Sequence, residues 1–583
     1  MRITQLNVLN TSRDMIRFFK GYNHQLYIGD NEWYEMGNMT SSYYPVLSPR
    51  DKRMHIAKHT QGSTHGLFAK TRLLWVHGKD LYYNGALVAN NQLSNTDKQF
   101  VSMGALVLIF PDKKVFNTST LQVTNMEVSW QTVGTVTYKL AKMDGTVYEN
   151  IEVSETAPET PEDGMLWMDT SSSPHVLKQW SSYSEMWVEI PTTYIRIESS
   201  HIGEAFNQYD GIKISNSVVS ALNGANIIQA KGTDYIVVTG LLDEMDTQTS
   251  VLNVVREVPD MDFLTEHNNR VWGCSSAKHE VYCCKLGDPY NWNAFEGLST
   301  DSYTATIGSD GDFTGAITYG NYVLFFKSDK LHFIQGDKPA NFVIGEKTLR
   351  GVEKGSEKSL AIVDEVLYYK SADGIVAYTG SLPDGLYDAF GGQRYKNAVG
   401  GGARSKYYVS MQAEDNTWHL FCYDTKRGMW HREDNLHVTY FSKYDNDLFY
   451  FDEDDNFGTI FGTKGHDNSM EVAGETHIEG DIPWYVETGN IGMESPDQKT
   501  LSRFLIRLRA DIGTTITISM QYDSTGVWEN KRTITSHTLT SFNIPVIPRR
   551  CDHMRMKIEG TGACKIFSIS KETEQGSELH GNL

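Results

Sequence analysis

The sequence predicts an all-β protein: a β-propeller that carries an inserted β-rich arm or platform region and a C-terminal β-sandwich. Three observations predict this fold class. Apolar and polar residues alternate with period 2 along most of the chain, short hairpin patterns recur at regular spacing, and few long stretches have helical periodicity. A stack of independent sandwiches is the alternative architecture.

The recurring element is a short hairpin. In "RLLWVHGKDLYYNGALV" and "NDLFYFDEDDNFGTIFG" an apolar strand leads into a polar turn and then into a second strand. Such hairpins recur roughly every 35–45 residues between about 263 and 465, a spacing typical of propeller blades. Two more lie near 66–88 and 100–120. Closure of one propeller predicts that hairpins near residue 80 neighbour those near 455.

Changes in strand pattern and composition along the chain give the expected domain order. An insertion between blades leaves from a loop and returns to it, so it projects as an arm. The expected parts are an N-terminal segment 1–40, first blades 41–120, an inserted region 121–262, remaining blades 263–475, a C-terminal sandwich 476–572 and a flexible tail 573–583. Within the insertion we expect a small tryptophan-rich module at 137–197 and a barrel-like module at 198–262.

Composition limits the possible functions. The 583 residues have a formal net charge of −20, which argues against a function that depends on gripping nucleic acid. Six scattered cysteines predict reduced, buried thiols rather than a disulfide framework. No apolar run is long enough for a membrane span, and the first residues lack a signal-peptide core.

Two clusters resemble metal sites without meeting their requirements. The spacing of the first matches no zinc pattern, and adjacent cysteines on a strand point to opposite faces. The second begins like a calcium loop, but Phe457 and Thr463 occupy the positions that need Gly and Glu. We therefore expect neither a metal nor a cofactor. The first cluster is His267, Cys274, His279, Cys283 and Cys284, and the second is Asp452, Asp454, Asp455 and Asn456.

Signatures of catalysis are missing from the sequence. It contains no G-x-S-x-G, H-E-x-x-H, G-x-x-x-x-G-K-[ST] or strand-linked G-x-G-x-x-G motif. We therefore predict no catalytic residues, although a glycosidase carboxylate pair could be present among the many acidic residues. Trp167, Trp180 and Trp187 form either the core of the small module or a surface for a glycan or partner.

Three stretches together resemble the tail-nozzle family of short-tailed bacteriophages, the tail tubular protein B-like tail-completion proteins, and a fourth is similar to a small module found in many phage tail and baseplate proteins. The first departs from the family pattern at "EMGNM", where a D-M-x-N element is expected. The stretches are "FKGYNHQLYIGDNEWYEMGNMTSSYYPVLSPRDKR", "HNNRVWGCSSAKHEVYCCKLGDPYNW", "LHFIQGDKPANFVIGEKTLRGVEKGSEKSLAIVDEVLYYKSADGIVAYTG" and "APETPEDGMLWMDTSSSPHVLKQWSSYSEMWVEI".

The resemblance implies a structural virion protein, made in the host bacterial cytoplasm. It implies a ring of six copies that contacts adaptor or portal-side ring proteins and tail fibres or spikes, and that lets double-stranded DNA pass without specific binding. Asn269 and Arg270 would fix a blade edge, and the corner would comprise Gly287, Asp288, Tyr290 and Trp292.

Charge adds one expectation about the DNA path. An acidic wall repels DNA, so we expect the turn Asp452, Glu453, Asp454 and Asp455 to line the channel. Two other classes stay open: a glycan-binding or glycan-degrading tail protein, and a secreted propeller that acts as an interaction hub, which would need an export signal.

Overall fold

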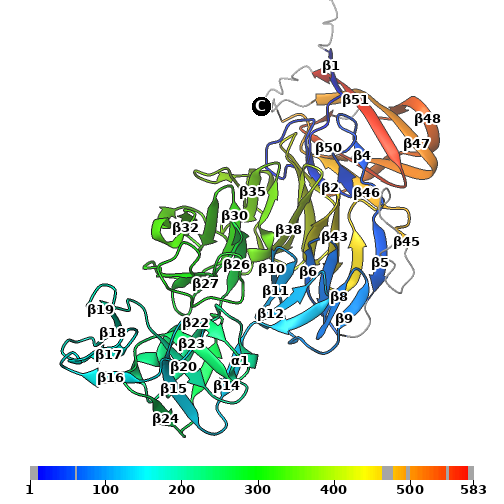
Figure 1. Cartoon of the computed structure of the whole chain (residues 1–583). Coiled ribbons are helices and arrows are strands. Elements are labelled where there is room, and N and C mark those ends of the chain that lie inside the picture. Colours follow the sequence, from blue (N-terminus) through cyan, green and yellow to red (C-terminus); the bar gives the residue numbers. More distant parts are fainter. Residues whose placement is uncertain (1–10, 59–61, 463–476, 494–498, 547–549, 576–583) are drawn as a thin grey trace, which may run out of the picture. The chain divides into compact units, whose positions relative to one another are not determined.

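The computed structural model describes residues 11–58, 62–462, 477–493, 499–546 and 550–575, and it confirms an all-β propeller fold (Figure 1). Its helical segments are α1 (Ile202–Ala205), η1 (Ser220–Leu222), η2 (Pro339–Asn341), η3 (Glu357–Ser359) and η4 (Asp388–Phe390). None of the helices in these described ranges is long and apolar enough to cross a membrane. The chain forms two compact units, 1–97 with 326–331 and 347–583, and 98–325 with 332–346.

The first unit contains four blades, in which strands that follow each other in sequence pair antiparallel. One comprises β6 (Thr64–Ala69), β7 (Leu73–His77), β8 (Asp80–Tyr83) and β9 (Ala86–Ala89); the next, β34 (Ala361–Val363), β35 (Val366–Lys370), β36 (Ile375–Tyr378) and β37 (Asp384–Gly385). The third blade comprises β38 (Tyr395–Ala403), β39 (Lys406–Ala413), β40 (Trp418–Asp424) and β41 (Met429–Arg432). The fourth comprises β42 (Val438–Tyr444), β43 (Asp447–Asp452) and β44 (Asn456–Thr459), and it is extended by β5 (Met54–Lys58) and β45 (His477–Ile478).

Residues from the two ends of the chain complete the blade formed by β42–β44. Strand β5 pairs with β44, and β6 lies against β42. Between these blades the Trp75 ring packs on Phe457, with centroids 5.3 Å apart, and the backbone N–H of Thr64 donates to Asp455 Oδ1 at 2.7 Å. The hairpin near residue 80 therefore neighbours the one near 455, as closure of the propeller predicts.

The second unit contains two complete blades between which the chain makes its long excursion. They are β10 (Gln99–Met103), β11 (Leu106–Phe110), β12 (Lys114–Asn117) and β13 (Gln122–Asn125), and β26 (Phe263–His267), β27 (Arg270–Ser275), β28 (Glu280–Cys283) and β29 (Tyr303–Thr306). Strand β10 lies beside β26, and Leu108, Val271 and Trp292 share one buried cluster. A further sheet comprises β30 (Gly315–Tyr319), β31 (Tyr322–Phe326), β32 (Lys330–Gln335) and β33 (Val343–Thr348).

The inserted arm forms two sheets. The larger comprises β14 (Val128–Gln131), β15 (Val136–Ala141), β20 (Tyr194–Glu198), β21 (Gly211–Ser215), β22 (Gly224–Lys231), β23 (Tyr235–Thr239), β24 (Asp246–Gln248) and β25 (Asn253–Arg256). The smaller comprises β16 (Ile151–Ser154), β17 (Leu166–Asp169), β18 (Val176–Ser181) and β19 (Met186–Glu189). The predicted module boundary of 137–197 is therefore too wide, because β15 and β20 pair within the larger sheet.

Both ends of the chain form the C-terminal β-sandwich. Its strands are β1 (Thr11–Ile16), β2 (Trp33–Gly37), β46 (Pro483–Thr488), β47 (Lys499–Tyr522), β48 (Glu529–Ile544), β49 (Arg550–Cys551), β50 (Met554–Thr561) and β51 (Cys564–Gln575). The first half of β47 pairs with β51 and its second half with β50, so this bent strand belongs to both layers. Phe504 and Ile506 from one half, and Ile516 and Ile518 from the other, share the core.

Two expectations about the ends of the chain need correction. The N-terminal segment is not separate, because β1 pairs with β51 and β2 pairs with β46. Residues 573–575, predicted to belong to the tail, are part of β51, which continues to Gln575; residues 576–583 lie outside the described part. A small sheet of β3 (Met39–Thr40) and β4 (Ser48–Pro49) follows β2.

Candidate functional site

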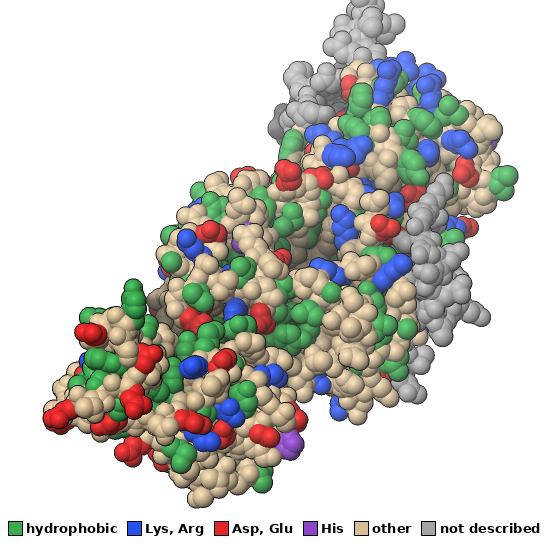
Figure 2. Space-filling view, viewed as in Figure 1, with side chains coloured by type: hydrophobic (Ala, Val, Ile, Leu, Met, Phe, Trp, Pro, Cys, Tyr) green, Lys and Arg blue, Asp and Glu red, His purple; other side chains and the backbone are tan. Residues whose placement is uncertain are grey.

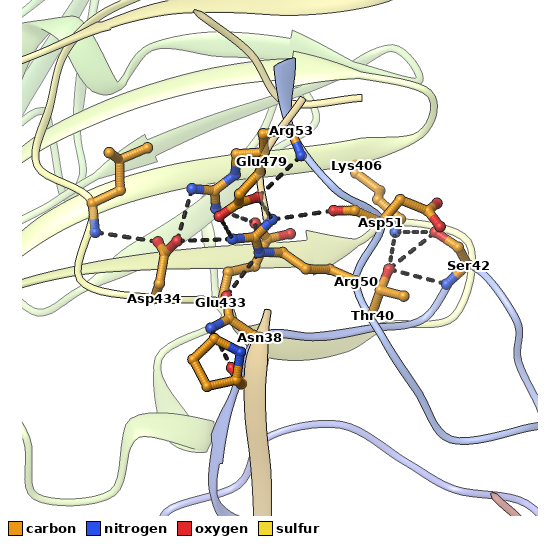
Figure 3. Close-up of polar contacts among 12 residues, drawn as sticks. Asn38, Thr40, Ser42, Arg50, Asp51, Arg53, Lys406, Glu433, Asp434 and Glu479 are labelled. Atoms are coloured by element: carbon orange, nitrogen blue, oxygen red, sulfur yellow. Dashed lines mark hydrogen bonds and ion pairs between the residues drawn. The ribbon is translucent and has the colours of Figure 1, made fainter. Parts of the chain in front are cut away.

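A buried ionic network joins Arg50 and Arg53, which precede β5, to the end of the blade of β38–β41 (Figure 3). Arg50 donates to both oxygens of Glu479, at 2.7 and 2.8 Å. Arg53 donates to Asp434 at 2.7 Å and to Glu433 at 2.6 Å. The Arg50, Arg53 and Glu433 side chains are at most 6% exposed, so these charges depend on one another for solvation.

The pKa shifts in this network agree with its geometry. Burial tends to lower the pKa of Arg53, but the charges of Asp434 and Glu433 outweigh it and hold that pKa well above its usual value. Burial tends to raise the pKa of Asp434, and the charges of Arg53 and Arg50 lower it overall. Arg53 and Asp434 are therefore charged at neutral pH, as expected of a structural ion pair.

One pair of carboxylates has the opposed pKa shifts that hydrolases often use. Glu35 and Glu487 are directly opposite each other on β2 and β46. Burial raises the pKa of Glu487 despite Arg555, and the charge of Glu35 adds to the rise. Burial also acts on Glu35, but its contact with His24 and the charge of Arg432 lower its pKa overall.

The surroundings of this pair do not resemble a hydrolytic centre. Arg432 donates to Glu35 at 2.8 Å, and Arg555 pairs with Glu487 at 2.5 Å, so each carboxylate already has a cationic partner. A cavity of about 630 Å³ lies close by, but neither glutamate lines it. A glycosidase pair needs both carboxyl groups directed at a substrate. We conclude that this cluster is structural, in keeping with the ionic networks that also perturb pKa values.

Arg270, which the resemblance implies would fix a blade edge, is a buried anchor. The residue is 2% exposed. Its guanidinium donates to the carbonyl oxygens of Cys284, Ser299 and Asp301, at 2.9, 2.8 and 2.6 Å. Arg270 thereby holds the loop between β28 and β29 against the blade. The preceding Asn269 has a φ of 58° in the β26–β27 turn.

The expected corner residues form a compact turn within that loop. Gly287 has a φ of 74°, and its N–H donates to the Asn269 carbonyl at 2.9 Å. Asp288 accepts from the Tyr290 N–H at 3.1 Å. Trp292 is 1% exposed and donates through Nε1 to the Pro289 carbonyl at 2.8 Å. The corner is therefore fixed by local hydrogen bonds.

The corner also holds the arm, through a residue that the sequence reasoning missed. Asn291 Oδ1 accepts from the Gly211 N–H of β21 at 2.7 Å, and its Nδ2 donates to Asp210 at 3.3 Å. Asp210 in turn pairs with Arg256 at 2.6 Å, and both side chains are nearly buried. The sequence signal was present, because Asn291 lies inside the "GDPYNW" motif, but nothing local identifies its partner.

The acidic turn is only partly available to line a channel. Asp452 accepts from the N–H groups of Asp454 and Asn456, at 3.0 and 2.9 Å, and Asp455 accepts from Thr64 in the adjacent blade. Glu453 and Asp454 are exposed, although Glu453 contacts His437 at 2.8 Å. Two of the four expected channel residues therefore stabilise the blade. Thr463, at the twelfth position of the rejected calcium loop, lies outside the described residues.

The three tryptophans meet on one face of the small sheet. The Trp187 ring lies edge-on to Trp167 and Trp180, with centroids 5.3 and 5.4 Å apart. Trp167 is 6% exposed, and the other two are partly exposed. Tyr183, in the turn between β18 and β19, is fully exposed. The hydrophobic core of the module instead contains Leu166, Met168 and Leu177, so the tryptophans form a separate, partly exposed aromatic cluster on the other face of the sheet.

Charge is concentrated on the same module. Residues 149–190 contain nine Asp and Glu residues against one lysine, Lys178, which lies 4.9 Å from the Trp167 ring. Figure 2 shows acidic side chains gathered over the region of β16–β19. The arm therefore combines exposed aromatic side chains with an acidic surface.

The cysteines offer no metal site. All six are free and buried. Cys283 and Cys284 belong to different buried clusters, and burial raises the pKa of Cys284 to about 12. In the part of the chain that the structure describes, no group of three or more His, Cys, Asp or Glu residues is placed to hold a metal ion.

No protein-family model and no curated protein matches the chain. Among solved structures, an exo-β-1,3-galactanase from Phanerochaete chrysosporium is 10% identical over 53% of this chain and 94% of its own, with a TM-score of 0.21. BamB from Moraxella catarrhalis is 11% identical over 64% and 95%, with a TM-score of 0.22. The phage phi92 endosialidase is 10% identical over 71% and 63%, with a TM-score of 0.20. Such scores carry no argument about activity.

Proposed function

We propose that the chain is a structural virion protein of the tail-nozzle type. Identical copies form a ring of six that conducts double-stranded DNA during genome ejection. The observation that carries the proposal is the inserted arm. The chain's own strands complete the blades, so the blades need no partner strand. The arm, by contrast, has an aromatic and acidic surface that stays exposed to solvent. Such a surface suits contacts with other tail proteins.

The charge of the chain supports the same role. A wall rich in Lys and Arg would retain DNA by neutralising its phosphates, and a net charge of −20 avoids this. The partners we propose are a second copy, an adaptor or portal-side ring, and tail fibres or spikes. The chain would be made in the host cytoplasm and function in the virion tail.

Negative-stain imaging of the purified chain tests this proposal. We expect rings with a central hole, since a nozzle must enclose a path for DNA. Mass photometry should give a mass six times that of one chain. Monomers alone, at every concentration tested, would contradict the proposal.

A glycan-binding or glycan-degrading tail protein is the second candidate. It is favoured by the aromatic cluster of the arm, in which Trp180 and Trp187 are partly exposed. Under the nozzle proposal, purified protein should leave bacterial surface polysaccharides uncleaved. Hydrolysis that is lost in Glu487→Gln, or glycan-array binding that is lost in Trp180→Ala, would favour the alternative. Glu414→Gln, in an exposed turn between β39 and β40, is the control for the first variant.

The acidic turn gives a prediction about the DNA path. Replacing Glu453 and Asp454 with Lys should change the free energy of unfolding by only about 0.5 kcal/mol each, because both are exposed. Genome ejection at low salt should slow, because the new lysines would attract passing phosphates. Salt should relieve the defect as the Debye length falls to about 8–10 Å.

The matched control replaces another exposed acidic pair, Glu414 and Asp415, with Lys. Ejection rates that are equal for the two double variants would show that the effect is not specific to the turn between β43 and β44. An unchanged rate in particles that contain the first variant would remove this turn from the DNA path.

A further inference from the structure

The C-terminal sandwich has an open edge on each side of one layer. Its strand order is β1, β51, β47, β48, and within the described residues β1 pairs only with β51 and β48 only with β47 (Figure 1). The outer side of each edge strand therefore presents a row of backbone N–H and C=O groups to solvent. Such a row can pair with a strand of another chain.

The second half of strand β48 lacks the charges and prolines that usually protect an edge. Its stretch 533–544, "TITSHTLTSFNI", contains no Lys, Arg, Asp, Glu, Pro or Gly. It is rich in Thr and Ile, which favour strands. Residues 535–539 are all exposed at a bend of the strand, where its register with β47 shifts on either side of His537, and Leu539 is 56% exposed. Natural edge strands generally avoid this combination of length and neutrality.

Strand β1 is the complementary edge. Four successive residues of this strand, 12–15, are exposed, and Met15 is 45% exposed. Each neighbouring pair along β1, β51, β47 and β48 is antiparallel. A second copy in the same orientation would therefore present its β1 antiparallel to β48. Because the two edges differ, their contact is heterologous, and repeated around an axis it can close a ring.

We propose that β48 of one chain pairs with β1 of a second copy, so that the C-terminal sheets join edge to edge around the ring. This inference rests on the proposed function, because it specifies the surface through which the ring forms. The exposed Leu539 and Met15 side chains supply apolar contacts beside the shared backbone hydrogen bonds.

Charged residues at the edge test the proposal in the full chain. Thr538→Lys with Leu539→Lys should convert rings to monomers in mass photometry, because lysines protect edges from pairing. The monomer should keep the hydrogen-exchange protection of β47 and β51, since both positions are exposed. Val343→Lys with Ile362→Lys, two exposed blade residues, is the matched control and should leave rings intact.

Engineered cysteines identify the partner strand. Ser12→Cys combined with Cys at 536, 538 or 540 in turn should give a ladder of crosslinked oligomers at one register, and neither single variant should do so. The native cysteines are buried and should not form crosslinks. Dimers from Thr538→Cys alone would mean that β48 pairs with itself, which overturns the proposal.

The outcomes separate the two proposals. A wild-type chain that never assembles contradicts the nozzle ring itself. Rings that persist in the Thr538→Lys, Leu539→Lys variant, with no ladder at any register, leave the nozzle in place and overturn the edge contact.

Discussion

Arg53→Met should lower the stability of the first unit by about 3–5 kcal/mol, because it leaves the buried Glu433 carboxylate with only the more distant Arg50 as a cationic partner. The Arg53 side chain is 6% exposed and that of Glu433 is 4% exposed. The loss should appear as a lower melting temperature and as faster hydrogen exchange in β5 and β41, the strands on either side of the network. Local exchange is the better measure, since a chain of several domains does not unfold in one step.

The matched control is the same substitution one residue earlier. Lys52→Met removes an exposed pair with Asp481, whose side chains are 43% and 62% exposed. Its effect should be within about 1 kcal/mol. Adding Glu433→Gln to Arg53→Met should restore part of the lost stability, because one stranded charge is removed. A double variant that is less stable than Arg53→Met would show that Glu433 stabilises the fold in another way.

The same network makes stability depend on pH. Burial acts to raise the pKa of Glu479, but the hydrogen bond and charge of Arg50 lower it overall, and the pKa of Asp434 is also lowered. A carboxyl whose folded pKa is lowered stabilises the fold above its unfolded pKa, near 4. This stabilisation is lost as the pH falls through the folded pKa. Arg53→Met should weaken that acid dependence in the strands around Asp434.

Local sequence patterns were sufficient for the blades. "RLLWVHGKDLYYNGALV" contains β7 and β8, and "NDLFYFDEDDNFGTIFG" contains β43 and β44, because alternation and turn residues are encoded within each hairpin. The pairings that were missed join distant parts of the chain: β1 with β51, β2 with β46, and β5 with β44. Nothing within a strand specifies a partner hundreds of residues away. The same reason explains the module boundary that divided β15 and β20 from their sheet.

Some residues of the candidate site were predicted from local sequence, whereas contacts that depend on distant parts of the chain were not. The tryptophans of the arm were found because aromatic residues are conspicuous in so small a module. The acidic turn was found as a charge run, but the hydrogen bond from Thr64 to Asp455 depends on how two distant blades meet. Arg270 was given a structural role on its hairpin, but its burial was not foreseen, because it depends on a loop that folds back about thirty residues later.

Arg270→Met should release that loop and loosen the hold on the arm. The substitution leaves the carbonyl oxygens of Cys284, Ser299 and Asp301 without this donor, and a buried unsatisfied acceptor costs about 1–3 kcal/mol. We expect a combined loss of roughly 3 kcal/mol or more. Hydrogen exchange should rise throughout residues 285–302.

The effect should extend from the loop to the arm. Asn291 lies within the loop and accepts from Gly211, so exchange at the Gly211 amide should rise with that of the loop. Arg350→Met is the control, because its pair with Asp373 is half exposed and should contribute at most about 1 kcal/mol. A loop that exchanges faster while Gly211 stays protected would show that the arm is held independently of Arg270. In that case contacts within the arm, such as the ion pair of Asp210 with Arg256, would be sufficient to protect the Gly211 amide.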